Sequence, residues 1–75
     1  EVGVSTEKPP HETLSDREYQ IFLLLASAKT VSEIADSLAL SGKTISTYRS
    51  RILEKMHLRN NAEIMHYAIE KQIKA

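Results

Sequence analysis

Four signals for the start of an α-helix divide this chain of 75 residues into short segments. In a capping box, a Ser, Thr or Asn side chain accepts a hydrogen bond from the backbone amide three residues later, and a Glu at that later position bonds back. Such pairs occur at Ser15–Glu18, Thr30–Glu33 and Asn60–Glu63, and Ser41 precedes a further helical pattern. Short helices must bury their apolar sides against one another, so the pattern predicts an all-α fold of four helices.

The first two helices are expected from about Asp16 to Ser27 and from the Thr30 cap to near Ala39. The first has too many apolar residues for one stripe, so it is predicted to be buried from more than one side. Its inner face comprises Tyr19, Phe22, Leu23 and Ala26, widened by Ile21, Leu24 and Leu25. Only Ala39 and Leu40 separate the second helix from the next start signal, which predicts a helix-turn-helix.

The segment from Ser41 to Met56, SGKTISTYRSRILEKM, predicts one amphipathic helix with two contrasting sides. One side carries Ile45, Tyr48, Ile52 and Met56, and the other carries Lys43, Ser46, Thr47, Ser50 and Glu54. Short hydroxyl side chains are poor helix formers, yet they let a helix approach the floor of a DNA groove. The basic flanks Lys43, Arg49, Arg51 and Lys55 can reach phosphates. We therefore interpret the segment as a DNA recognition helix, the alternative being an ordinary solvated face.

Net charge is zero, but the charges are unevenly distributed. Residues 1–42 contain three bases and seven acids (−4), residues 43–59 five bases and one acid (+4), and residues 60–75 two of each (0). Positive charge is thus concentrated on the recognition helix and the following turn. A local patch of this kind can bind phosphates while the acidic remainder limits non-specific association.

The last helix is expected from about Asn61 to Ile73. Its apolar residues cover roughly half of the circumference, more than the ~100° needed to dock on one core. Two interpretations remain open: broad burial in a small core, or a dimer interface, for which Ile64, Tyr67 and Ala68 are the candidates.

Residues 1–13 contain Gly3 and the Pro9-Pro10 pair without apolar periodicity, which predicts a linker or tail with little fixed structure ahead of a folded domain at 14–75. The chain does not begin with Met, so it is expected to be either a processed protein or, preferably, a piece of a longer one. The absence of cysteine is typical of an intracellular protein and predicts a cytoplasmic location. The longest apolar run, 21–26, is too short to cross a bilayer.

An enzyme is not expected. His11 lies in the tail and His57 in a turn, while Glu63 and His66 form only one copy of the i,i+3 pair that a di-iron site needs twice. No Gly-rich phosphate loop is present, and the hydroxyl groups have no adjacent base. The sequence therefore predicts no catalytic residue, cofactor or metal site.

Three blocks of sequence resemble the LuxR/FixJ-type helix-turn-helix domain found at the C-terminus of two-component response regulators. They are LSDREYQIF at 14–22, VSEIADSLALSGKTIS at 31–46 and RILEKMHLRNNAEIMHYAI at 51–69. The resemblance implies a third helix in the major groove of DNA, a fourth helix that pairs domains into a homodimer, and a receiver domain upstream. It implies base contacts from Ser46, Thr47 and Ser50, and phosphate contacts from Thr30, Ser32, Lys43, Thr44, Arg51 and Lys55.

Three positions depart from the family pattern. Many members have Gly where this chain has Ala28 and His57, just after helices, where a left-handed conformation favours Gly. Both helices are therefore expected to end less sharply or with slight strain. Gly42 occupies the first turn of the recognition helix, where a branched apolar residue is more usual, so fraying is expected there.

Two alternatives to the regulator remain open at this point. The promoter-reading C-terminal domain of a sigma factor also contains a helix-turn-helix, but usually ends soon after the recognition helix. A small helical module that binds only proteins would have no affinity for duplex DNA. The operator, the input signal and the choice between activation and repression are not encoded in any motif found here.

Overall fold

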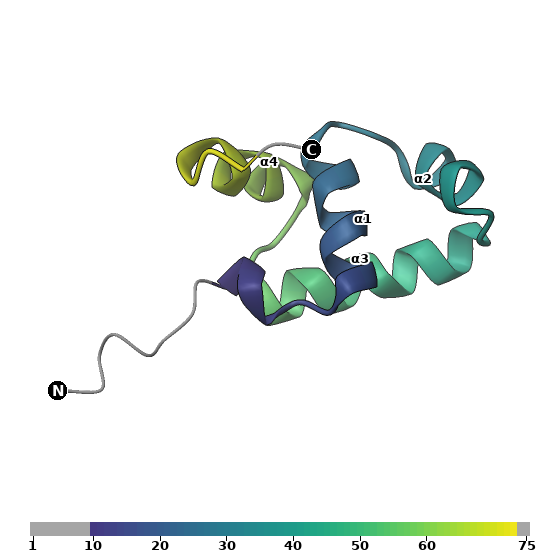
Figure 1. The fold of residues 1–75 in the computed structure, drawn as a ribbon, viewed down its shortest axis with the longest axis horizontal. Helices are drawn as coiled ribbons and strands as arrows, with labels where there is room; N and C mark the ends of the chain where they lie inside the picture. The colour runs from purple at the N-terminus through teal and green to yellow at the C-terminus, as the bar shows by residue number, and fades with distance from the viewer. Residues whose placement is uncertain (1–9, 74–75) are drawn as a thin grey trace, which may run out of the picture.

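The computed structural model describes residues 10–73, and all secondary structure in this range is helical. A short 3-10 helix, η2 (Pro10–Thr13), precedes α1 (Asp16–Ala26), α2 (Val31–Leu38), α3 (Gly42–Met56) and α4 (Asn61–Glu70). Figure 1 shows α2 and α4 near opposite ends of α3, with α1 between them. The predicted four-helix, all-α fold is confirmed. None of the helices in this range is long and apolar enough to span a membrane.

The four helices begin at the predicted caps. Ser15 and Thr30 each accept a bond from the amide three residues later, and Glu18 and Glu33 bond back to complete the two capping boxes. Ser41 caps α3 through the amide of Thr44. The third predicted box is only half formed. Asn60 accepts from the amide of Glu63, but the Glu63 carboxylate accepts from the amide of Arg59 instead of from Asn60.

All four helices end in the same hydrogen-bonded turn, in which a residue in the left-handed conformation follows the helix. These residues are Ala28, Ala39, His57 and Gln72, with φ between 56° and 66°. The residue after each bonds back five positions to a helix carbonyl: Lys29 to Leu24, Leu40 to Ala35, Leu58 to Leu53 and Ile73 to Ala68. This is the Schellman motif, here built without glycine. Because the motif forms around Gln72, α4 ends at Glu70 and not at Ile73, the predicted last residue.

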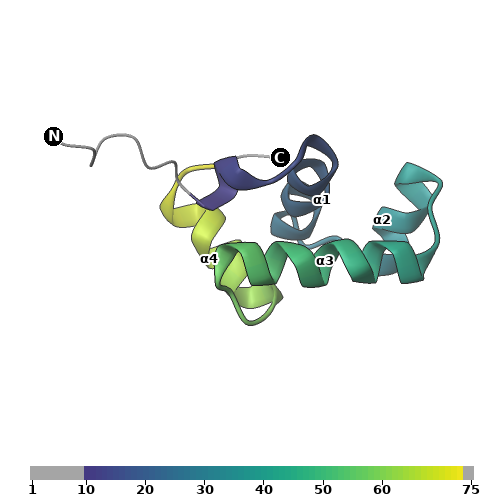
Figure 2. The ribbon, with the colours of Figure 1, turned by 90° about the horizontal axis from the view of Figure 1, so that it is seen from below.

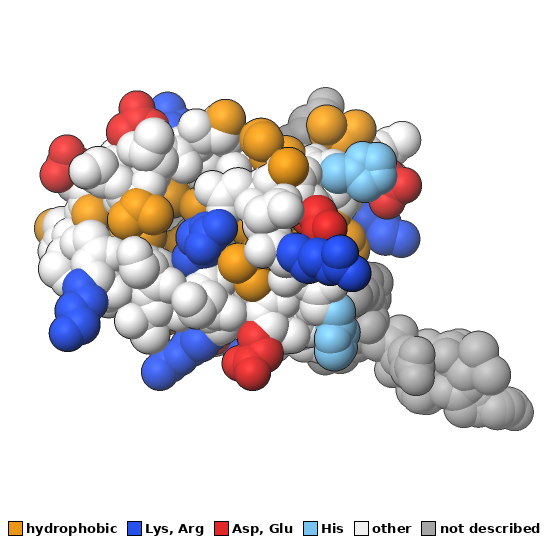
Figure 3. All heavy atoms as spheres, turned by 180° about the vertical axis from the view of Figure 1, so that it is seen from behind, with side chains coloured by type: hydrophobic (Ala, Val, Ile, Leu, Met, Phe, Trp, Pro, Cys, Tyr) orange, Lys and Arg blue, Asp and Glu red, His pale blue; other side chains and the backbone are white. Residues whose placement is uncertain are grey.

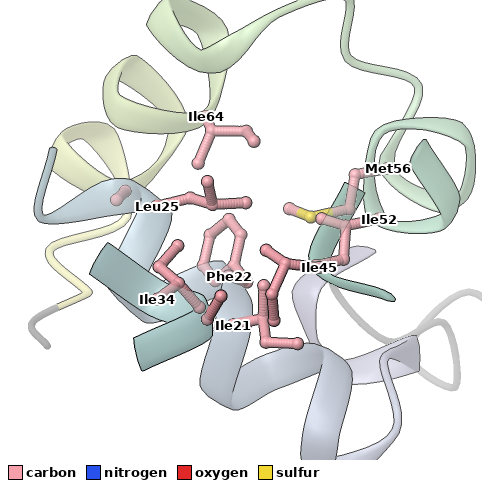
Figure 4. Packing of buried hydrophobic residues seen from close by; sticks show 10 residues of the cluster. Ile21, Phe22, Leu25, Ile34, Ile45, Ile52, Met56 and Ile64 are labelled. Carbon is pink, nitrogen blue, oxygen red and sulfur yellow. The ribbon is translucent and has the colours of Figure 1, made fainter. Parts of the chain in front are cut away.

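The core is a single cluster of apolar side chains that every α-helix enters (Figure 4). Ile21, Phe22 and Leu25 of α1 meet Ile34 of α2, Ile45, Ile52 and Met56 of α3, and Ile64 of α4. Seven of these side chains have 0–1% of their surface exposed, and Met56 has 4%. Burial of this extent fixes the rotation of α3 about its own axis, because the side chains of Ile45 and Ile52 cannot leave the core without opening cavities.

Helix α1 is the central element and packs on α2, α3 and α4, as its predicted burial from several sides requires. The details of its inner face differ from the prediction. Ile21, Phe22 and Leu25 are the fully buried positions, whereas Tyr19 and Leu23 are only half-buried. A helical wheel cannot locate the centre of a broad apolar face, since the neighbouring helices decide which part of it is covered.

Residues 1–9 of the predicted linker lie outside the described range, but its last four residues have a defined conformation in η2. The His11 ring stacks on Tyr19 with centroids 6.2 Å apart, and its Nδ1 lies 2.9 Å from the hydroxyl of Tyr67. This part of the segment therefore departs from the expectation of little fixed structure. The physical reason is contact with aromatic rings on α1 and α4.

Candidate nucleic-acid interface

Helix α3 lies along one side of the domain and leaves one of its sides uncovered (Figure 2). The exposed side chains on that side, here called the outer face of α3, belong to Lys43, Ser46, Thr47, Ser50, Arg51 and Glu54. At about 100° per residue they lie opposite the buried Ile45 and Ile52. The structure therefore exposes all three predicted base-contacting residues together on one side of the helix.

The three hydroxyl residues offer different hydrogen-bonding groups. The Thr47 hydroxyl donates to the carbonyl of Lys43 at 3.1 Å, so its lone pairs and its methyl group remain for an outside partner. The side chains of Ser46 and Ser50 have no partner within the described residues, and each can donate or accept. Such small, adaptable groups suit contacts with base edges in a groove.

Two long side chains predicted to bind phosphate also make contacts within the domain. Arg49 is half-buried and donates through Nε to Oδ1 of Asn61 at 2.6 Å, which ties α3 to the start of α4. The Lys55 ammonium lies 2.8 Å from Oε1 of Glu18 and ties α3 to α1. Each of the two thus satisfies a polar group of a neighbouring helix, and a phosphate contact from either remains a prediction.

Glu18 is the only charged side chain buried within the described residues, with 4% of the residue exposed. Its carboxylate accepts from the Lys55 ammonium and from the amide of Ser15. The hydrogen bond from Lys55 is the largest cause that lowers the pKa of this carboxyl, followed by the bond from Ser15. An ionised Glu18 thus anchors the last turn of α3 at the first turn of α1.

The positive charge that remains on the outer face is smaller than the local sequence suggests. Of the five bases between residues 43 and 59, Arg49 and Lys55 are engaged as described, and Arg59 lies in the turn after α3. Lys43 and Arg51 remain, together with one acid, Glu54. Figure 3 accordingly shows Lys and Arg side chains that stand apart from one another and form no continuous basic patch.

A second group of exposed polar residues lies at the start of α2, beside the turn that leads from α1. Thr30 and Ser32 are exposed, as predicted for phosphate contacts, and the Thr30 hydroxyl already accepts from the amide of Glu33. Lys29 is exposed directly before the cap and was not among the predicted contacts. Its position next to a helix N-terminus was the signal that could have identified it. Thr44 is half-buried, and its hydroxyl accepts from that of Ser41 at 2.9 Å.

The candidate dimer residues lie within the domain. Ile64 and Ala68 have 0% and 4% of their surface exposed and pack in the core, so their assignment to an interface between two copies is corrected. Tyr67 is half-buried between Phe22 and His11. The large apolar side chain that α4 exposes is Ile69, with 75% of its surface accessible.

The Glu63–His66 pair considered as a metal ligand set does not form. Glu63 bonds to the amide of Arg59, and His66 lies 3.3 Å from Glu70. Among residues 10–73 there is no group of three His, Asp or Glu side chains placed to hold a metal ion.

The fold and the outer face of α3 define the class of this protein: a helix-turn-helix domain that binds DNA as the output part of a transcriptional regulator. The chain belongs to the luxR family of bacterial regulatory proteins, whose family pattern matches residues 12–68. The predicted resemblance is thereby confirmed, and the sigma-factor alternative is set aside.

Among its relatives are two proteins named response regulators. The chain is 43% identical over 60 residues to the response regulator GacA of Pseudomonas aeruginosa and 40% identical over 60 residues to the response regulator UvrY of Escherichia coli. Each match covers 80% of this chain but only 28% of the relative.

Proposed function

We propose that this domain reads a specific duplex sequence by placing α3 in the major groove, and that it serves as the output domain of a two-component response regulator. The observation that carries the proposal is the row of small hydroxyl side chains on the outer face, opposite a core that fixes the rotation of the helix. A rigid helix that presents Ser46, Thr47 and Ser50 together can bring its backbone close to base edges.

In this arrangement the side chains divide by length. Ser46, Thr47 and Ser50 are too short to reach phosphates from the middle of the face, so they contact bases directly, through water, or through the Thr47 methyl group. Lys43 and Arg51 are long and exposed, and they bind phosphates on either side. Thr30, Ser32 and Lys29 at the start of α2, with Thr44 at the start of α3, bind a neighbouring stretch of backbone.

The larger assembly belongs to the same proposal. The relatives are response regulators of which this chain spans 28%, which supports a phosphorylatable receiver domain upstream in the parent protein. Two copies bind as a homodimer on repeated half-sites about one DNA turn apart. Since Ile64 and Ala68 are buried, the dimer contact uses the exposed part of α4 around Ile69. We place the protein in the cytoplasm, where bacterial DNA is accessible.

The test is fluorescence anisotropy on labelled promoter duplexes, titrated with salt. The logarithm of the binding constant should fall by about 0.9 per phosphate contact for each tenfold rise in salt. Arg51→Ala should lower this slope by about one contact, whereas Lys71→Ala, an exposed lysine after α4, should leave it unchanged. Salt-independent binding, or no binding to any duplex, contradicts the proposal.

A further inference from the structure

One side chain of the outer face has no role in the arrangement above. Glu54 is the only acidic residue of α3, and it is exposed. At about 100° per residue it points in the same direction as Lys43 and Thr47, away from the buried side of the helix. The outer face of α3, which is proposed to contact DNA, therefore carries one negative charge near its centre.

Among residues 10–73, no partner accounts for this carboxylate. Glu18, Glu33 and Glu63 bond to backbone amides at helix starts, and Glu70 pairs with His66. Within the described residues the Glu54 side chain has no hydrogen bond or ion pair. A carboxylate is an acceptor only, so bringing it against DNA unpaired would leave a desolvated charge among phosphates.

We infer that Glu54 is a specificity-determining residue that accepts a hydrogen bond from the amino group of a cytosine at one end of each half-site. In the major groove the amino groups are N4 of cytosine and N6 of adenine. Adenine also presents its N7 acceptor beside the amino group, which repels the second carboxylate oxygen. Guanine and the O4 of thymine offer acceptors to this side chain, so cytosine is the base that fits.

The spacing along α3 is compatible with this contact. Glu54 follows Ser50 by four residues, which corresponds to about 6 Å along a helix that rises about 1.5 Å per residue. Base pairs are stacked at about 3.4 Å, so the two side chains lie roughly two base pairs apart. A straight helix leaves a curved groove towards its ends, and the longer glutamate can still reach a base where a serine could not.

This inference rests on the proposed DNA binding, and its test separates the two. Wild type, Glu54→Ala and Glu54→Gln are each used to select binding sites from a randomised duplex library, and their affinities are measured on the selected sites. Glu12→Ala, which removes one exposed acidic charge from η2, is the matched control. Thermal unfolding of each variant confirms that the fold is intact.

Wild type and Glu12→Ala should select cytosine at one position that Glu54→Ala leaves unselected, with a loss of discrimination of about 5- to 100-fold at that position only. Glu54→Gln should shift the preference there towards adenine, because an amide both donates and accepts. If Glu54→Ala binds all duplexes more tightly and keeps every base preference, the residue acts only through its charge and the inference is wrong. If wild type selects no sequence, the proposed function itself fails.

Discussion

The Lys55 ammonium lies 2.8 Å from the buried Glu18 carboxylate and joins the last turn of α3 to the first turn of α1. Glu18 also completes the capping box with Ser15, so a single carboxylate fixes the start of one helix and the end of another. The pair holds the recognition helix at a set position on the scaffold helix.

Replacing Lys55 with Ala should destabilise the domain by about 1–3 kcal/mol, because the buried Glu18 carboxylate would lose its charged donor. Lys71→Ala, which removes an exposed lysine, should change the free energy of unfolding by less than about 0.5 kcal/mol. Urea denaturation measures both. Equal stability of the two variants would show that the ion pair contributes nothing.

The same pair gives the stability a defined dependence on pH. The folded pKa of Glu18 is below its ordinary value, so its contribution is fully present above the pKa of the unfolded chain. This contribution is lost as the pH falls through the lowered, folded pKa. We expect Glu18→Gln to be less stable than wild type at pH 7 and the difference to shrink on acidification. Thermal unfolding as a function of pH measures this, and a difference that is constant with pH contradicts it.

Two isoleucines on the last two helices form a matched pair for testing the core. Ile52→Ala should destabilise by about 2–5 kcal/mol, because Ile52 is fully buried and its truncation leaves a cavity. Ile69 is 75% exposed, and Ile69→Ala should lie within about 0.5 kcal/mol of wild type. Chemical denaturation of the two variants gives the comparison, and similar losses would mean that the buried side of α3 is wrongly assigned.

Helix ends without glycine offer a route to higher stability. His57 has a φ of 57°, where a Cβ costs about 1–2 kcal/mol, so His57→Gly should stabilise the domain by roughly 1 kcal/mol despite the added freedom of the unfolded chain.

The opposite substitution is expected to help at Gly42. This residue is helical, and a Cβ there would lie 3.9 Å from Cγ1 of Val31, an ordinary contact. Gly42→Ala should therefore stabilise by about 0.5–1 kcal/mol. A lower melting temperature in either variant would contradict the backbone argument.

On the outer face, substitution should separate base reading from phosphate binding. Ser50→Ala should lower the ratio of specific to non-specific affinity by about 1–3 kcal/mol and leave the salt dependence unchanged. Arg51→Ala should weaken binding to all duplexes alike. The measurement is anisotropy on specific and scrambled duplexes at several salt concentrations. A loss of specificity with Arg49→Ala but not with Ser50→Ala would mean that the helix presents a different side to DNA.

Local chemistry was sufficient to predict the number, order and starting points of the helices. Ser15, Thr30 and Ser41 act on amides three residues away, so their role is visible in a short stretch of sequence. The outer face of α3 was also predictable, since the buried positions Ile45 and Ile52 are spaced by two turns of a helix. Ala28 and His57 adopt the left-handed backbone in which slight strain was expected, but both helices end in a closed hydrogen-bonded turn and not loosely.

Tertiary structure decided which charged and apolar side chains contact other helices of the same chain and which are left for an outside partner. Arg49 and Lys55 look like phosphate ligands in sequence, but each also donates a hydrogen bond to a partner 12 or 37 residues away, Asn61 or Glu18. Ile64 and Ala68 look available for a second copy, yet the core of the same chain covers them. The local sequence pattern shows whether a side chain is long and charged, or apolar. Only the packing of distant segments determines whether it meets a helix of its own chain or an outside partner.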